Sequence, residues 1–390
     1  MTTLTALDQS AGSTHTSASL LTRAAEVAPV LEANAARHDA DGTFVTESFE
    51  ALGRAGLLKA AVPAELGGDG ATIAELTALQ RTLAHHCGST ALASSMHQHV
   101  TAFTAWRHRR GLPGAEATLR RVADDGIVLV STGGGDYSHP SGTARRVDGG
   151  FRVSGRKRFV SQSAVGTVAS TMFRYDDPQE GERVLNVAVP LAAPGVTVVS
   201  TWDSLGMRGT ASDDLVFDDV FVPDDKVLAK RPYGVVDGPL QVISCIAFPI
   251  VSGAYLGVAE AAYAAALASV QASPTKRESA VVQRQLGLMR HRLAVASWAL
   301  DGALVAVGDD PKPGADAYFA VMAAKREVAG AGIEVCDLAM EVVGGSAYYK
   351  GSVVERCYRD IRAAKFHPLD PETTLVETGK HALGLPGVLA

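Results

Sequence analysis

Helical periodicity dominates the first part of the chain. Apolar residues recur every three or four positions in SLLTRAAEVAPVLEANAARHD, TESFEALGRAGLL and STALASSMHQHVTAFTAWRHR, all between residues 19 and 109. This spacing places apolar side chains along one face of a helix. The stretch before it, residues 1–18, is rich in Ser, Thr and Ala and has no apolar periodicity. We therefore expect a flexible tail at residues 1–18 and an N-terminal α-helical domain at residues 19–125.

The pattern changes at residue 126. GIVLVST, TARRVDGGFRVSGRKRFVS, VASTMFRY, RVLNVAVP and LVFDDVFVP are short, rich in β-branched residues and bounded by Gly, Pro or Asp. Segments of this kind are typical of strands, and VDGGFRV predicts a hairpin with its turn at residues 148–150. These features predict a central antiparallel β domain over residues 126–230.

Long alanine-rich helical patterns fill the last part of the chain, residues 231–390. Their length predicts a C-terminal four-helix bundle. The order of helices, strands and helices, without alternating βα units, indicates an α+β protein and argues against Rossmann and TIM-barrel folds. The long Ala-rich faces favour burial against sister chains, so we expect a homo-oligomer.

Composition and charge narrow the function classes. The 390 residues carry a formal net charge of −6 with no basic stripe, which argues against a nucleic-acid partner. No unbroken run of 18 apolar residues occurs, so we expect no membrane span. The four cysteines are far apart, which fits a reducing cytoplasm and predicts neither disulfides nor a metal site. The usual phosphate-binding loops and metal-binding motifs are also absent from the sequence.

Four motifs, in order along the chain, resemble the acyl-CoA dehydrogenase superfamily of flavoproteins. They are GLLKAAVPAELGG (56–68), SLGMRGTASDDLVFDDVFVPDDKVL (204–228), GAYLGVAEAAYAAA (253–266) and EVVGGSAYYKGSVVERCYRDIRAA (341–364). The resemblance covers about residues 20–385 and implies the acyl-CoA dehydrogenase fold, a flavin cofactor and a homotetramer, or at least a dimer.

The resemblance also implies a flavin site in STGGGD (131–136) and FVSQS (159–163). The cofactor-binding candidates are Ser131, Thr132, Gly133, Phe159, Val160, Ser161, Arg208, Gly344 and Gly345. Two alternatives remain open: Phe159 and Val160 as plain strand core, and the glycines at 133–135 as a plain turn. The family's Arg-x-x-Phe-Gly segment, which reaches the FAD pyrophosphate of a neighbouring subunit, is replaced here by SVQASPTKRESAVVQ (269–283). FMN and FAD are therefore both candidates.

The sequence departs from the dehydrogenases at the catalytic base. Most members carry a Glu after the RD.R segment, and Pro368 stands at that position here. A second subgroup carries its Glu near the position of Ala247, which is followed by Phe248. Neither position can take the proton that a dehydrogenase must remove. The nearby acids Glu260, Asp370 and Glu372 are the fallback bases.

Histidines offer a different chemistry. A branch of the fold uses reduced flavin with O2 and places a histidine on an N-terminal helix, a serine on the flavin strand and a histidine after the RD.R helix. The matching candidates here are His97, His99, Ser161, Ser163 and His367. An ordinary histidine pKa of about 6.5 suits proton donation near neutral pH. His97 and His99 lie about 200° apart on a helix, so at most one of them faces the flavin slot. The alternative for His367 is a helix C-cap, with Pro368 ending the helix.

We therefore expect a flavin-dependent oxidoreductase. The leading hypothesis is a two-component monooxygenase that receives reduced flavin from a separate reductase and uses O2 on a small organic substrate. The second is a dehydrogenase of acyl-CoA, or of an acyl-carrier-protein thioester, with a relocated base. The third is a non-catalytic flavin-binding relative of the fold.

Overall fold

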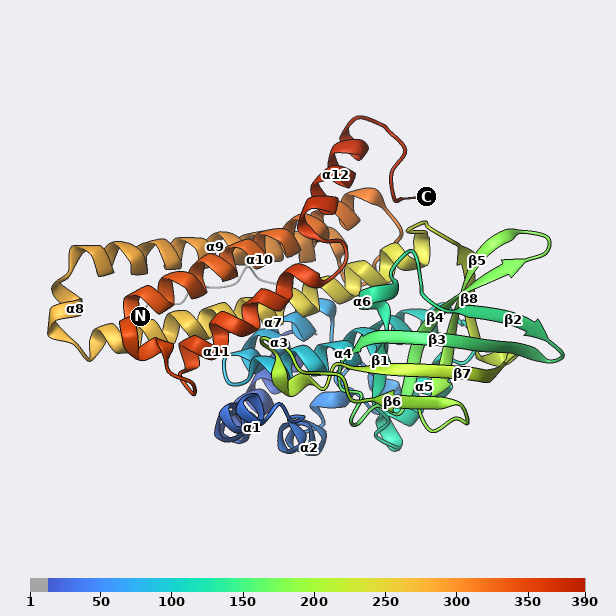
Figure 1. Ribbon diagram of the computed structural model, residues 1–390, viewed down its shortest axis with the longest axis horizontal. Coiled ribbons are helices and arrows are strands. Elements are labelled where there is room, and N and C mark those ends of the chain that lie inside the picture. The colour runs from blue at the N-terminus through green and yellow to red at the C-terminus, as the bar shows by residue number, and fades with distance from the viewer. Residues whose placement is uncertain (1–12, 390) are drawn as a thin grey trace.

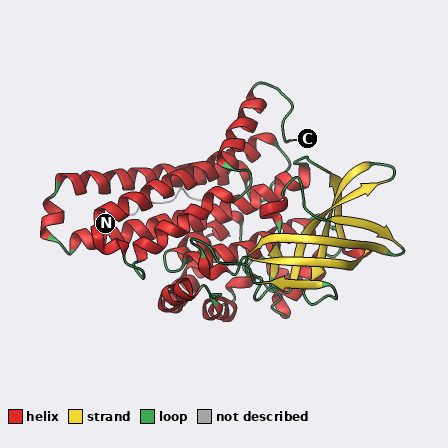
Figure 2. Cartoon of the chain, in the orientation of Figure 1, coloured by secondary structure: helices red, strands yellow, loops and turns green. Residues whose placement is uncertain are grey.

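The computed structural model describes residues 13–389. Along the chain, helices come first, strands follow, and further helices come last (Figures 1 and 2). The N-terminal helices are α1 Ser13–Asp41, α2 Thr46–Arg54, α3 Ile73–Ala84, α4 Gly88–His108 and α5 Ala115–Asp124. Residues 1–12 of the predicted tail lie outside the described residues. Residues 13–18 belong to α1, so the helix begins before the predicted boundary at residue 19.

Local signals explain where these helices start. Thr72 and Glu75 form a capping box at the start of α3: the Thr72 hydroxyl accepts from the Glu75 N–H at 3.2 Å, and the Glu75 carboxylate accepts from the Thr72 N–H at 2.8 Å. Two otherwise unpaired backbone donors are satisfied in this way. The capping box therefore fixes the N-terminal end of α3.

The sheet has eight strands in the order β6-β7-β3-β2-β4-β5-β8, with β1 paired to β4. The strands are β1 Leu129–Ser131, β2 Thr143–Val147, β3 Gly150–Val160, β4 Val168–Asp177, β5 Gly181–Pro190, β6 Val196–Val199, β7 Asp213–Pro223 and β8 Val227–Pro232. The predicted β2–β3 hairpin is confirmed, with Gly149 at φ 71° in its turn. A tight turn of this kind needs the positive φ that glycine adopts readily.

The prediction of an antiparallel sheet was wrong in one respect. β1 and β2 both pair parallel to β4, and the short helix α6 Gly133–Asp136 lies between them. β1 and β2 are therefore successive stretches of chain alongside one strand, interrupted where α6 leaves the sheet. The alternation of residues in a strand does not reveal its direction, so the pattern could not predict this pairing.

The C-terminal helices are α7 Gly238–Gln271, α8 Pro274–Glu278, α9 Ala280–Val307, α10 Ala315–Val343, α11 Val353–Asp360 and α12 Pro371–Ala382. The predicted four-helix bundle consists of three long helices, α7, α9 and α10, and the much shorter α11, which packs on α7 and α10. Helix α7 is long and apolar enough to cross a membrane, but 89% of its most apolar window is buried within the protein. It is a core helix shared by the bundle and by α3 and α4.

Two glycines bring α7 against α3. A Cβ atom at Gly253 would lie 2.5 Å from the Thr77 carbonyl oxygen, and one at Gly257 would lie 2.2 Å from that of Arg81. Any side chain at these positions would push the helices apart. The GAYLG segment therefore allows α7 of the C-terminal part to lie directly against α3 of the N-terminal part.

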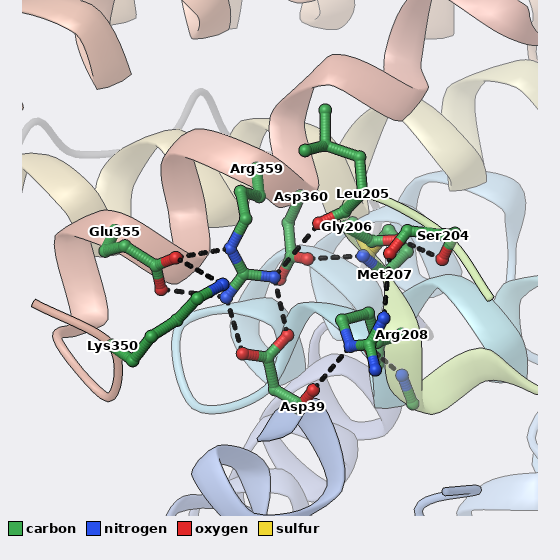
Figure 3. Close-up of polar contacts among 12 residues, drawn as sticks. Asp39, Ser204, Leu205, Gly206, Met207, Arg208, Lys350, Glu355, Arg359 and Asp360 are labelled. Carbon is green, nitrogen blue, oxygen red and sulfur yellow. Dashed lines mark hydrogen bonds and ion pairs between the residues drawn. The ribbon is translucent and has the colours of Figure 1, made fainter. Parts of the chain in front are cut away.

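A buried ion-pair network joins three distant parts of the chain (Figure 3). The Arg359 guanidinium on α11 donates to Asp39 of α1 at 2.9 Å and to the two carboxylate oxygens of Glu355 at 2.6 and 2.8 Å. It also donates to the Leu205 carbonyl at 3.1 Å. The Asp360 carboxylate accepts from the backbone N–H of Met207. The loop at residues 204–208 is thereby held against α11.

Candidate active site

A cavity of about 740 Å³ lies between the sheet, α4, α7, the loop at 201–207 and the segment that follows α11. It is lined mostly by apolar and small side chains, with hydroxyl and imidazole groups and several Arg and Asp side chains among them. This is the usual composition of a site for an organic ligand or cofactor. Among the described residues, no group of three or more metal-ligating side chains occurs.

Phe159 forms part of the sheet wall of the cavity because its strand is irregular. The register of β3 against β7 shifts between Lys157 and Val160, and the side chains of both residues are fully buried. Phe159, between them, has φ 59° and a ring that is 57% exposed and edge-on to Trp202 at 6.4 Å. Phe159 therefore faces the cavity as predicted. Val160 packs in the sheet core, so for its side chain the plain strand interpretation is correct.

The STGGGD segment is divided between the cavity and the sheet. Ser131 and Gly133 line the cavity, as does Gly134, where an added Cβ would meet no atom within 4 Å. The Thr132 side chain is buried instead and donates to the Thr171 hydroxyl at 2.9 Å. Its side chain does not line the cavity, and its assignment to the flavin stays a prediction.

Of the two serine candidates, Ser161 lies at the cavity. Its hydroxyl contacts that of Ser212 at 2.8 Å, and Ser212 in turn contacts Thr210 at 2.7 Å. Ser163 lies away from the cavity, where its hydroxyl contacts the Ala211 carbonyl and the Asp213 carboxylate, each at 2.9 Å. Ser163 is therefore a structural residue, and the hydroxyl chain behind Ser161 holds that side chain in place.

The structure also separates the two neighbouring histidines of α4. His99 lines the cavity. His97 does not, since its Nε2 donates to the Leu58 carbonyl at 2.7 Å and its Nδ1 accepts from the Leu129 N–H at 3.0 Å. Both ring nitrogens of His97 are used to join α4 to β1, which leaves none for a ligand. His97 was thus wrong as a catalytic candidate.

His367 lies at the cavity beside Tyr255. Its Nε2 is 2.7 Å from the Tyr255 hydroxyl, and the two rings are 5.5 Å apart. His367 is also the C-cap residue of the short 3-10 helix Ile361–Phe366, directly before Pro368, so both interpretations of this residue remain open. With the Tyr255 hydroxyl as the donor to Nε2, the proton of the neutral ring is on Nδ1.

Burial keeps these imidazoles uncharged. Loss of solvent lowers the pKa of His97 and His99 to about 4, and loss of solvent, with Lys325 and His99 nearby, lowers the pKa of His367 to about 3. The assumption of a histidine pKa near 6.5 was therefore wrong. His99 donates from Nδ1 to the Ser95 carbonyl at 3.0 Å, which leaves Nε2 as an acceptor. The cavity therefore has one neutral imidazole acceptor, His99, and one neutral imidazole donor, His367.

These pKa values predict how stability depends on pH. His97 and His99 have a pKa near 6.5 when unfolded and about 4 when folded, so the unfolded chain binds more protons between those values. Stability should fall as pH falls from 7 to 5, by about 1–2 kcal/mol for each histidine. Asp360 acts in the opposite direction, because burial raises its pKa to about 6. In urea titrations, His99→Gln should lose about 1–2 kcal/mol less than wild type over this range. An unchanged pH slope would contradict the assignment.

The sequence predicts that no carboxylate stands at the two positions where the dehydrogenases carry their catalytic Glu, and both positions lie at the cavity. Pro368, Ala247 and Phe248 all line the cavity. Among the described residues, the acids that line it are Asp203, which pairs with Arg208 at 3.0 Å, and Asp214, which pairs with Arg156 at 2.5 Å.

The fallback bases lie elsewhere. Glu260 pairs with Arg81 and with His85 at 2.9 Å, and Asp370 caps α12. Glu372 is in the first turn of α12 and does not line the cavity. No unpaired carboxylate therefore lies at the cavity in the described part of the chain.

Three further flavin candidates lie outside the cavity. Arg208 donates to the Asp39 carbonyl at 2.7 Å and pairs with Asp203, so it joins α1 to the loop at 201–207. Gly344 and Gly345 lie at the end of α10 and do not line the cavity of this chain. These three residues do not line the cavity of this chain, and their assignment to the flavin stays a prediction.

Comparison with known proteins agrees with this architecture. Three models match in order: the acyl-CoA dehydrogenase N-terminal domain at residues 21–108, the middle domain at 131–220 and the C-terminal domain at 249–367. The chain belongs to the acyl-CoA dehydrogenase superfamily. Together with the relatives described next, this membership makes the protein a flavin-dependent oxidoreductase.

Its relatives include N-oxygenating members of this superfamily. L-evernosamine nitrososynthase of a Micromonospora species is 33% identical, over 88% of this chain and 84% of the relative. Amino sugar nitrososynthase DnmZ of Streptomyces peucetius is 31% identical, over 87% of each. A solved structure of KijD3 with FMN and dTDP-3-amino-2,3,6-trideoxy-4-keto-3-methyl-D-glucose has a TM-score of 0.81 and 30% identity, over 96% of this chain and 95% of KijD3.

Sequence reasoning missed several residues of this superfamily member's cavity. Tyr255 supports His367, and Tyr137 and Ser244 add hydroxyl groups to the wall. Tyr255 lies in the GAYLG motif, whose single aromatic residue among small ones was a usable signal. Tyr137 and Ser244 come from unrelated segments, and no pattern in the sequence joins them.

Proposed function

We propose that the protein is the oxygenase component of a two-component flavin monooxygenase. It takes reduced flavin and O2, transfers one oxygen atom to a small organic substrate and releases the other as water. The observation that carries the proposal is the composition of the cavity at the family's base positions. Pro368 and Ala247 line it in place of a carboxylate, and the neutral imidazoles of His99 and His367 at the same cavity can donate and accept hydrogen bonds.

A flavin fits the residues that are present. The cavity volume of about 740 Å³ suits a tricyclic ring. The open space at Gly134 lets a ligand approach the backbone closely, and Phe159 and Trp202 offer aromatic surface. Ser131, Ser161 and Ser170 provide uncharged hydrogen-bonding groups on the sheet side. The flavin, FMN or FAD, would supply the two electrons and the site at which O2 is activated.

The side chains of this chain would supply hydrogen bonds and exclude water. The neutral His367 ring can donate a hydrogen bond from Nδ1–H to an oxygen atom that leaves, and His99 Nε2 can accept a hydrogen bond from the substrate. Tyr255 holds His367 in the tautomer that donates. The apolar walls contributed by Leu92, Met96 and Val251 exclude water, which limits the loss of activated oxygen as hydrogen peroxide.

The nitrososynthase relatives support this proposal over the dehydrogenase. Two of them are named as nitrososynthases, and the KijD3 structure holds FMN with an amino sugar nucleotide. We extend from them an N-oxygenase type of reaction and FMN as the first cofactor to test. The missing carboxylate in this chain is the independent support, because it removes the group that a dehydrogenase needs.

Two partners follow from the proposal. A separate reductase would supply reduced flavin in the cytoplasm. Other copies of this chain would pack against the C-terminal helical bundle. Helix α9 supports the second point, since Val281, Trp298 and Val305 on it are 67%, 67% and 79% exposed. Isolated subunits rarely leave several large apolar side chains of one helix in water. We therefore propose a homo-oligomer, with the family's tetramer as the expected state.

The test is the source of the oxygen in the product. Turnover with reduced FMN and isotopically labelled O2 should place one labelled atom in the oxidised substrate.

A further inference from the structure

A buried lysine lies close to the cavity and has no part in the chemistry described above. Lys325 of α10 is 7% exposed. Its Nζ donates to the Leu369 carbonyl at 2.6 Å and lies 5.7 Å from the centre of the Phe248 ring. Phe248 lines the cavity, whereas Lys325 does not. The ammonium group is therefore next to a wall residue of the cavity but outside the cavity itself.

This ammonium group is buried without a carboxylate partner. Among the described residues, no ion pair reaches Lys325, and the Leu369 carbonyl is its one hydrogen-bond acceptor. Burial lowers the pKa of Lys325 to about 8, and the charge of Asp370 acts in the opposite direction. Taking a cation out of water costs free energy that one carbonyl and one aromatic ring offset only in part. A buried charge of this kind beside a cavity indicates a role beyond packing.

The contact made by Lys325 falls two residues after His367. Residues 367–370 link the short 3-10 helix Ile361–Phe366 to α12 and are neither helix nor strand. Regular backbone hydrogen bonds therefore do not fix this segment. The His367 ring contacts the Tyr255 hydroxyl of α7 at 2.7 Å, and the backbone beyond it is held from α10 by the lysine.

The Leu369 carbonyl depends mainly on this lysine. The Thr374 hydroxyl lies 3.5 Å from the same oxygen, but it also donates to the Asp370 carbonyl at 2.9 Å, which is the more favourable distance. Lys325, at 2.6 Å and with a charged donor, makes the stronger contact. Without the ammonium group, the Leu369 carbonyl would keep only the long contact.

The orientation of the His367 ring decides what it can donate. Tyr255 of α7, His99 of α4 and Lys325 of α10 are the titratable groups that act on it from the packed helices. Asp370, on its own segment, acts on Lys325. Burial lowers the pKa of His367, and Lys325 and His99 lower it further, so the ring is uncharged at neutral pH. A neutral ring has a single N–H, and its use as a donor depends on where that N–H points.

We propose that Lys325 is a positioning residue for His367. By holding the Leu369 carbonyl, it keeps the ring against the Tyr255 hydroxyl, so that Nε2 accepts and the proton is on Nδ1. The inference rests on the proposed function, because it concerns the ring that would donate to the oxygen atom that leaves. It adds to the reaction a residue that does not line the cavity.

Nitrogen NMR tests this role without turnover. Full-length protein labelled with ¹⁵N-histidine and supplied with FMN would be measured at neutral pH, and the His367 signals are those lost in His367→Gln. Wild type should show one His367 tautomer, with its proton on Nδ1. Lys325→Met keeps the side-chain length but removes the donor, so the ratio of this tautomer to the other should fall at least about fivefold. Lys325→Arg keeps a charged donor and should resemble wild type.

Lys276→Met is the matched control. Lys276 donates to the Val343 carbonyl at 2.9 Å, at the C-terminal end of α10, and does not line the cavity. The substitution removes the same kind of contact from the same bundle, so the His367 signals should stay as in wild type. Where oxygen is transferred, Lys325→Met should also lower the ratio of product to hydrogen peroxide about fivefold.

An unchanged His367 spectrum in Lys325→Met would overturn the positioning role. A mixture of tautomers in wild type would overturn it as well, and that result requires no variant to fold. Equal spectral changes in Lys325→Met and Lys276→Met would also reject it, since both would then act through the bundle as a whole. The predicted spectra in a protein that transfers no oxygen would instead reject the proposed function and leave the positioning of His367 by Lys325 standing.

Discussion

Replacing His367 with Ala should cut substrate oxygenation by at least about tenfold while reduced flavin and O2 are still consumed. When the Tyr255 hydroxyl, 2.7 Å away, donates to Nε2, the neutral ring carries its proton on Nδ1 and can donate a hydrogen bond to the oxygen atom that leaves. Without it, electrons from reduced flavin should appear as hydrogen peroxide. The measurement is the ratio of product to hydrogen peroxide per O2 consumed.

Two variants sharpen this experiment. Tyr255→Phe keeps the aromatic ring but no longer fixes the tautomer of His367, so its ratio should fall between those of wild type and His367→Ala. His291→Ala removes an exposed histidine of α9 and should behave as wild type. A His367→Ala protein that melts earlier but couples O2 to product as well as wild type would show that the residue only closes a helix end.

The largest stability effect is expected at Arg359. Arg359→Ala would leave the carboxylates of Asp39 and Glu355, whose side chains are 12% and 10% exposed, without their buried partner. Removal of one member of a buried network typically costs about 3–5 kcal/mol. Denaturant titration should show a loss of this size, and Arg359→Lys should recover only part of it because an ammonium cannot make the paired contacts of a guanidinium.

The control for Arg359 is an exposed arginine. Arg54 pairs with Glu50 at 3.5 Å on the surface of α2, so Arg54→Ala should change stability by less than about 1 kcal/mol. The Arg359 change should also weaken flavin binding, because the same guanidinium holds the Leu205 carbonyl at the cavity wall. Equal effects of the Arg359 and Arg54 substitutions would contradict the role given to the network.

Local pattern predicted the succession of elements, and counting from RDIR located the missing base. The position of Pro368 depends only on chain distance from that motif, and the structure places it at the cavity. Position along the chain did not determine which side chains of α4 face the cavity. The angle between His97 and His99 showed that at most one could face the site, but the rotation of α4 is set by its packing on β1 and α7.

Strand irregularity and long-range contacts caused the other differences. A regular strand would not bury both Lys157 and Val160, and the bulge that allows it also turns Phe159 to the cavity. The pKa of a histidine depends on how deeply the fold buries it, which no single residue pattern records. Tyr137, Ser244 and Tyr318 meet only because α6, α7 and α10 converge.

The central claim is oxygen transfer from O2, and isotope labelling tests it most directly. The protein would be supplied with an amine substrate, FMN, a separate flavin reductase and ¹⁸O2, and the product analysed by mass spectrometry. The account predicts one ¹⁸O atom in each product molecule and no turnover without O2. An acyl-CoA that bleaches the bound oxidised flavin anaerobically, giving an unsaturated product without ¹⁸O, would contradict it.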